Sequence, residues 1–158
     1  MKKRQRTEYG SRRSVSRLVA VQALYQLELA GGEPNLAILQ AQELNCRFKD
    51  QLAELSFILP DNDLVNRLVF GVVDKGAEID DLVDRALLET RTVNGLEVVL
   101  RIALRAGTYV LLYHSDIDPP VVIDEYVEIT KAFFGNKEPA LVNGVLDRLA
   151  KMLASDKV

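Results

Sequence analysis

The sequence predicts an all-α fold, a helical bundle of six to seven helices in two packed three-helix lobes. Three observations lead to this fold class. Aromatic residues make up only 6% of the chain and tryptophan is absent, which favours aliphatic helix packing over a sheet sandwich. Alanine, leucine, glutamate and arginine, all strong helix formers, occur throughout. Glycine and proline separate stretches in which apolar residues recur every three or four positions.

The length of 158 residues fits one domain. Chains of this size bury roughly 70% of their unfolded surface, so the core needs neither disulfides nor metal. We predict a basic N-terminal arm over residues 1–13 and a single helical domain over residues 14–158. Glycine, asparagine and proline near the middle of the chain divide this domain into lobes of about 14–78 and 79–158.

The first helix is predicted to follow the arm. Residues 1–10 carry charge and Gly10 but almost no apolar periodicity, so we expect them to be mobile until a ligand binds. Ser11 or Ser14 can cap the helix, and Gly31-Gly32 ends it. Its predicted inner stripe consists of Leu18, Val21, Gln22, Tyr25 and Leu29.

Three further helices are predicted before residue 90. Pro34 suits the first position of one, with inward positions at Leu36, Leu39, Ala41, Leu44 and Phe48. Pro60 and the capping residues Asp61 and Asp63 begin the next, which Gly76 breaks or bends. Helical spacing then continues to about Glu89, and Asn94-Gly95 marks a turn.

The stretch from Leu96 to Tyr113 contains β-branched and aromatic residues that a strand would also accept. Its length favours a central, mostly buried helix, in which Arg101 and Arg105 need partners. Asp118-Pro119-Pro120 begins the next helix and Gly135 closes it. Pro139 begins the last helix, whose stripe comprises Val142, Val145, Leu146, Leu149, Met152 and Leu153.

Charge is distributed unevenly along the chain. Residues 1–17 hold seven cations and one acid, a balance of +6, so the remainder carries −9 within a formal net charge of −3. A basic segment of this kind is typical of proteins that bind a polyanion, and we predict that the polyanion is a nucleic acid. Arg12, Arg13 and Arg17 extend the basic arm onto the first helical turns. Their guanidinium groups match phosphate oxygens and can stack on exposed bases. A solvated helix start is the alternative.

The sequence gives little support for an enzyme. It contains no glycine-rich phosphate loop, no CxxC pair and no HExxH helix, and we predict no catalytic residue, cofactor or metal. The carboxylates Asp124, Glu125 and Glu128 are interpreted as a solvated helix start, and His114-Ser115-Asp116 as a loop. The single cysteine, Cys46, and the absence of an apolar signal segment or a 20-residue apolar run indicate a cytoplasmic protein without a membrane span.

Three stretches in order resemble the transcription antitermination factor NusB family. The first is SRLVAVQALYQLEL, Ser16 to Leu29, with the core Val21-Gln22-Ala23-Leu24-Tyr25. The second runs from Leu104 to Phe133 and contains a leucine-arginine pair, a proline before a valine-rich helix start, and an Ile-Asp-Glu series. The third is LVNGVLDRL, Leu141 to Leu149. Val110 departs from the family, since many members carry glutamate there.

The resemblance implies a two-lobed helical protein that binds the boxA element of ribosomal RNA transcripts together with the ribosomal protein NusE. The complex joins RNA polymerase and promotes antitermination. On the first helix, Tyr25 would stack on a base or touch the partner, or lie in the core. Gln22 and Asn143 are further RNA-binding candidates, although structural roles are open for both: Gln22 as a hydrogen-bonding residue, and Asn143-Gly144 as a point of close helix approach.

A second hypothesis is a protein-interaction scaffold whose acidic helical surface docks a basic partner, with the arm only a generic polyanion tail. The two hypotheses are compatible in part, because the family acts as a heterodimer with NusE. A homodimer that buries the basic helix would hide the RNA surface.

Overall fold

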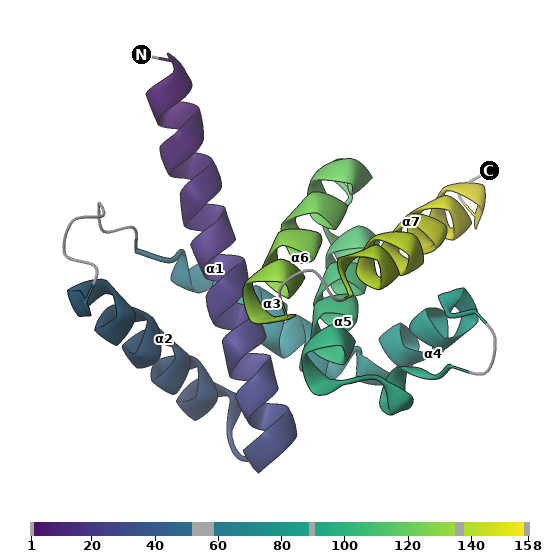
Figure 1. Cartoon of the computed structure of the whole chain (residues 1–158), viewed down its shortest axis with the longest axis horizontal. Helices are drawn as coiled ribbons and strands as arrows, with labels where there is room; N and C mark the ends of the chain where they lie inside the picture. Colours follow the sequence, from purple (N-terminus) through teal and green to yellow (C-terminus); the bar gives the residue numbers. More distant parts are fainter. Residues whose placement is uncertain (1, 52–58, 89–90, 135–137, 157–158) are drawn as a thin grey trace. The chain divides into compact units, whose positions relative to one another are not determined.

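The structure, a computed structural model, describes residues 2–51, 59–88, 91–134 and 138–156. All regular elements in these ranges are helical, so the predicted all-α fold is confirmed (Figure 1). In chain order they are α1 (Lys2–Ala30), α2 (Pro34–Gln51), α3 (Asn62–Asp74), α4 (Gly76–Ala86), the 3-10 helix η1 (Val93–Gly95), α5 (Val98–Tyr113), α6 (Pro119–Phe134) and α7 (Pro139–Asp156). None of the helices in these ranges has both the length and the apolar character that crossing a bilayer requires.

The chain divides into two compact units, Met1–Phe70 and Gly71–Val158. The boundary between these units falls inside α3. In the first unit α2 packs against α1 after a turn at Gly31 and Gly32, which have positive φ values of 70° and 98°. The glycines end α1 where the sequence predicts.

A serine links α1 to the start of α3 within the first unit. The Ser16 hydroxyl donates to the Arg12 carbonyl at 2.8 Å and accepts from the Asp61 backbone N–H at 2.7 Å. Asp61 Oδ1 in turn accepts from the backbone N–H groups of Asp63 and Leu64 at 3.0 and 3.4 Å. Asp61 thus caps α3 as predicted, and Ser16 fixes the middle of α1 against that cap.

The predicted start of the first helix is wrong. The helix begins at Lys2, so Ser11 and Ser14 lie inside α1 instead of capping it, and the basic arm is part of the helix. Most of residues 2–13 are lysine, arginine, glutamine or glutamate, which favour helix, and the single Gly10 costs only about 1 kcal/mol. Residues of high helix propensity therefore extend α1 toward the N-terminus, although this part of the helix has no amphipathic stripe.

The predicted inner faces of α1 and α2 are partly wrong. Leu36, Leu39 and Leu44 are 54%, 58% and 46% exposed, whereas Ala41 is buried as predicted, together with Ala37 and Ile38. The side chain of Phe48 lies outside the described part. On α1, Leu29 is 60% exposed because it lies at the end of the helix, whereas Val19, Ala20, Val21, Ala23 and Leu24 are buried.

In the second unit α5 is the central helix and packs against α4, α6 and α7 (Figure 1). Its buried residues include Leu100, Ile102, Leu104, Ala106 and Val110, as the prediction of a buried helix requires. Gly76 begins α4 and η1 lies at the predicted Asn94-Gly95 turn. The helix starts at Pro119 and Pro139 are also confirmed, while Gly135 lies outside the described residues.

Both arginines of α5 make hydrogen bonds within the second unit. Arg105 makes a bidentate pair with Asp80, from Nε to Oδ1 at 2.7 Å and from Nη2 to Oδ2 at 2.9 Å. Arg101 Nη1 donates to the Asn94 carbonyl at 3.4 Å. A third arginine, Arg148 of α7, donates to the Ala86 carbonyl at 2.7 Å. These bonds hold α4 and η1 against α5 and α7.

Candidate nucleic-acid interface

The basic residues of the N-terminus share one continuous helix. The N-terminal turns of α1 extend past the far end of α2 (Figure 1). Arg12 and Arg13 are exposed where these turns approach the packed part of the unit. A helical backbone fixes the spacing of neighbouring cations at about 1.5 Å rise per residue, which a flexible tail does not. The Ser16 link to Asp61 lies one turn further along, so Arg12 and Arg13 are held close to a fixed point.

Arg17 departs from the predicted site. Its side chain is only 3% exposed, so the expectation that it lies on a solvent-facing phosphate site is wrong. The reason is helical geometry: Arg17 lies on the same face as Val21 and Leu24, which belong to the core of the unit. Arg17 has an interaction within the protein, and a buried cation needs one. Arg17 therefore belongs to the structure beneath the basic surface.

Gln22 and Tyr25 lie about one turn apart on α1 and are both half-buried. The Gln22 Oε1 atom is buried and accepts no hydrogen bond from the described residues. Buried carbonyl oxygens are normally paired, so this amide is suited to accept a donor from a ligand. Tyr25 is neither a core residue nor fully exposed, which leaves part of its ring at the surface.

The arginines and the polar pair do not share one face of α1. At about 100° per residue, Gln22 lies on the opposite side of the helix from Arg13 and about 80° from Arg12. Arg12 and Gln22 are separated by about 15 Å along the axis. A single nucleic-acid strand that contacts both sets must therefore cross α1 obliquely.

Asn143 belongs to the second unit, where it is exposed on α7. The structural interpretation of its neighbour is wrong: a Cβ on Gly144 would meet only Arg148 Nη1, at an ordinary 3.5 Å. The close approach between α5 and α7 occurs at Gly107 instead, where a Cβ would lie 3.0 Å from the Leu146 methyl carbons. Asn143 is thus available to a ligand, and Gly144 is not needed for packing.

The other polar residues considered in the sequence lie on α6 and at the end of α5. No group of three histidine, cysteine, aspartate or glutamate side chains that could hold a metal ion occurs among the described residues. Asp124 and Glu128 are exposed, and Glu128 pairs with Lys131 at 3.2 Å. His114 follows the end of α5, and its ring packs against Tyr109.

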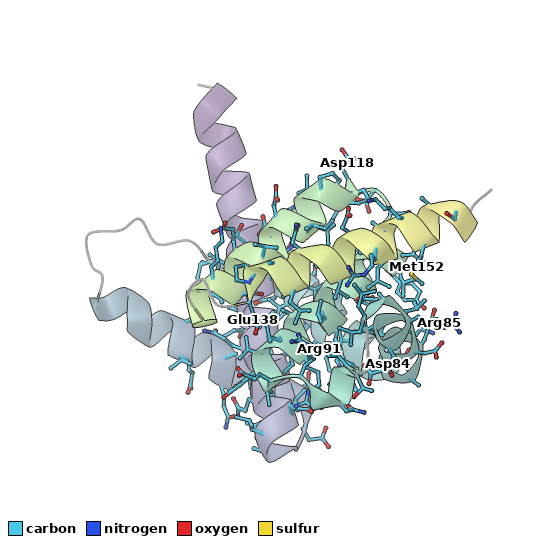
Figure 2. All side chains as sticks on the ribbon, turned by 45° about the vertical axis from the view of Figure 1, so that its right-hand side comes forward. Asp84, Arg85, Arg91, Asp118, Glu138 and Met152 are labelled. Carbon is cyan, nitrogen blue, oxygen red and sulfur yellow. The ribbon has the colours of Figure 1, made fainter. Side chains whose placement is uncertain are left out.

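Sequence reasoning missed two surface features of the second unit. One is a pocket of about 400 Å³ near the start of α5, and Figure 2 labels two of its lining residues, Arg91 and Glu138. Its lining includes one cation and two carboxylates, which makes it a poor phosphate site. The other is an exposed ring cluster at the end of α5. The only sequence signal for it is the four-residue spacing of Tyr109 and Tyr113, which also suits a buried helix.

The geometry of α1 and the three motif stretches can be compared with known proteins. Residues 14–151 match the NusB family. The chain belongs to the NusB family. It is 40% identical over 147 residues to the transcription antitermination protein NusB of Rhizobium meliloti (strain 1021), covering 93% of this chain and 91% of that protein. The corresponding protein of Sinorhizobium fredii (strain NBRC 101917 / NGR234) is 39% identical over 148 residues, covering 94% and 91%.

Solved structures of the family have the same fold. NusB of T. maritima matches with a TM-score of 0.70 and 31% identity, covering 87% of this chain and 89% of that chain. A chain from the crystal structure of the antitermination factors NusB and NusE in complex with double-stranded RNA matches with a TM-score of 0.71. It is 24% identical, with 88% and 96% coverage, so this likeness shows the fold alone. The predicted family membership is confirmed.

Proposed function

We propose that this protein is an RNA-binding transcription antitermination factor. It binds boxA-type RNA of ribosomal RNA transcripts together with the ribosomal protein NusE and promotes antitermination by RNA polymerase. The observation that carries the proposal is the basic helix α1, with Arg12 and Arg13 exposed, in a chain of the NusB family. The names of the relatives support it, and a NusB–NusE–RNA complex contains a chain of the same fold. No catalysis and no cofactor is part of the proposal, and the site of action is the cytoplasm.

RNA recognition has two parts in this proposal. Arg12 and Arg13 contact phosphates, where their guanidinium groups make charge-assisted hydrogen bonds. Gln22 and Tyr25, on another side of α1, read unpaired bases through the amide and the ring. Arg17 acts from inside, by holding α1 in place. Asn143 provides a separate amide contact from α7.

The protein partner binds the acidic remainder of the chain. Beyond residue 17 the chain carries a formal charge of −9, which suits a basic ribosomal protein. Association with NusE and then with the RNA polymerase complex is part of the proposal because the chain belongs to the NusB family; the charge distribution is compatible with a basic partner. A homodimer that covers α1 would compete with RNA and serve as an inactive state.

A second candidate function, a scaffold that docks a basic partner, is favoured by one observation. Leu36, Leu39 and Leu44 leave an apolar face of α2 exposed, and such faces are used in protein association. Deletion of residues 1–13 separates the two functions. Loss of RNA binding with NusE binding retained supports the RNA-binding function, whereas unchanged RNA binding supports the scaffold.

The proposed phosphate contacts are tested by salt-dependent RNA binding of an Arg12→Ala/Arg13→Ala variant. Two lost contacts should weaken binding about tenfold at near-physiological salt and reduce the log-log salt slope by about 1.4. The matched control is Arg85→Ala/Lys151→Ala, which removes two exposed cations from α4 and α7. Equal effects of the two double variants would show that only net charge matters and would overturn the α1 site.

A further inference from the structure

The C-terminal end of α5 presents a fixed cluster of rings on the second unit. The ring centroids of Tyr109 and Tyr113 lie 5.1 Å apart with planes tilted by 35°. The His114 ring meets Tyr109 edge-on, at 5.5 Å and 70°. Tyr113 is 42% exposed. A Cβ on Gly71 would overlap the Tyr109 ring, so the backbone of α3 at Gly71 lies directly against this ring. We call Tyr109, Tyr113 and His114 the tyrosine patch.

Carboxylates flank the tyrosine patch. The Tyr113 hydroxyl donates to Glu78 Oε2 at 2.8 Å, and this hydrogen bond raises the pKa of Tyr113. The charge of the nearby Asp74 acts in the same direction. Both carboxylates belong to exposed residues, and the Asp74 side chain is 76% exposed. The most exposed ring of the patch therefore has negative charge beside it.

A cation already lies near this ring and one of these carboxylates, Asp74. Lys75 Nζ lies 5.9 Å from the centroid of the Tyr113 ring and 3.8 Å from Asp74 Oδ2. Both distances are near the outer limit for such interactions, and the lysine side chain is 44% exposed. Lys75 can therefore leave for solvent. An arginine fits the same position better, because its planar guanidinium stacks on a ring and pairs with carboxylates in a bidentate manner.

We propose that the tyrosine patch docks an arginine of a basic protein segment, with the guanidinium stacked on Tyr113, paired with Asp74 or Glu78, and Lys75 displaced. This proposal assigns a contact surface for a protein partner. It rests on one part of the proposed function, that a basic protein binds the acidic part of the chain beyond residue 17. The patch does not suit RNA, because two carboxylates against one lysine repel the phosphate backbone. Its location at α3, α4 and α5 also separates it from α1 in the sequence.

The proposal is tested by NMR titration of the full chain with a capped nonapeptide that contains three arginines separated by glycine and serine. The resonances of Tyr113 and Glu78 should shift on binding. Tyr113→Leu should weaken peptide binding about two- to fivefold, the range that an exposed cation–π contact gives. Tyr113→Phe keeps the ring and should retain most of the affinity. Equal affinities for Tyr113→Leu and the wild type would overturn the stacking contact.

Charge controls complete the test. Glu78→Gln retains an acceptor for the Tyr113 hydroxyl but loses the charge, and with Asp74→Asn it should weaken binding further. Asp147→Asn, which changes an exposed carboxylate on α7, should leave peptide binding unchanged. Equal weakening by Asp147→Asn, or larger Tyr113 shifts with oligouridine than with the peptide, would overturn the proposal. Tyr113→Leu should bind boxA-type RNA like the wild type. If the wild-type protein itself does not bind boxA-type RNA, the proposed function fails, and the peptide result is not affected.

Discussion

The helices α2 and α7 are similar in design but differ in burial. Both have 18 residues and begin with proline. In α7 the periodic apolar residues Val142, Val145, Leu146 and Leu149 are all fully buried. In α2 three leucines of the apolar pattern are about half exposed.

The difference comes from the number of neighbours. Among the residues that the structure describes, α7 packs against α4, α5 and α6, whereas α2 packs mainly against α1. A helix with one neighbour buries a narrow face, and in α2 that face consists of small residues and Ile38. Periodicity thus predicts that a helix forms, and the surrounding helices decide which apolar residues are covered.

The largest expected effect compares one leucine from each helix. Leu146→Ala in α7 should destabilise the protein by about 2–5 kcal/mol, because it leaves a cavity beside Gly107 in the core of the second unit. Leu36→Ala in α2 should change stability by no more than about 0.5 kcal/mol. Urea unfolding of both variants measures the two values. Similar losses of stability in the two variants would show that Leu36 is buried in α2 as Leu146 is in α7.

The next effect concerns the polar bonds that hold the second unit together. Arg105 and Asp80 are 16% and 27% exposed, whereas the neighbouring pair Arg85 and Asp81 is 64% and 61% exposed. Arg105→Ala should cost about 1–3 kcal/mol because it leaves a partly buried carboxylate unpaired. Arg85→Ala should cost less than about 1 kcal/mol. Thermal or urea unfolding measures both losses of stability. Equal losses would show that the partly buried pair contributes no more than the exposed pair.

A smaller effect is expected at two glycines that lie close together in sequence. Gly71→Ala should shift the Tyr109 ring, and the overlap should exceed the gain of about 1 kcal/mol in helix propensity, for a net loss of up to about 2 kcal/mol. Gly76→Ala has no atom within 4 Å of the new methyl and should be neutral or stabilising by about 0.4–1 kcal/mol. Unfolding curves and the Tyr109 ring resonances check both expectations. A stabilised Gly71→Ala variant would show that the ring can move freely.

The smallest effect is a change in one titration. The hydrogen bond to Glu78 raises the pKa of Tyr113 in the folded protein. The neutral tyrosine is therefore favoured by folding, so its contribution to stability is complete below the pKa of the unfolded chain and is lost as pH rises through the higher folded value. Tyrosinate absorbance of the wild type and Glu78→Gln measures this. An unchanged midpoint of the Tyr113 titration in the variant would contradict the assignment of the raised pKa to Glu78.

Much of the fold was predictable from local sequence signals. Gly31-Gly32, Asp61, Gly76, Pro119 and Pro139 mark helix boundaries through backbone conformation and capping, which depend on few residues. The start of α1 was not predictable from these signals. Helix-forming residues extend it past the two serines, and no glycine-proline signal stops it. The exposed face of α2 was also missed, because its burial depends on contacts that periodicity does not specify.

The candidate site was predicted in part. Charge alone indicated the basic end of α1, and the structure leaves Arg12 and Arg13 exposed. The charge pattern could not indicate that Arg17 is buried, since its burial depends on the packing around Val21 and Leu24. The tyrosine patch was missed for a related reason. Two tyrosines with helical spacing look alike in a core and at a surface, and here Tyr113 is exposed while Tyr109 is half-buried.

The most direct test of RNA recognition is fluorescence anisotropy of labelled boxA-type RNA and a scrambled control at near-physiological salt, with the wild-type protein alone and with NusE. We predict that the protein binds the boxA-type RNA selectively, that NusE tightens this binding, and that Arg12→Ala/Arg13→Ala weakens it about tenfold. Equal, salt-sensitive binding to both RNAs that NusE does not change would contradict sequence-selective recognition and reduce α1 to a generic polyanion-binding helix.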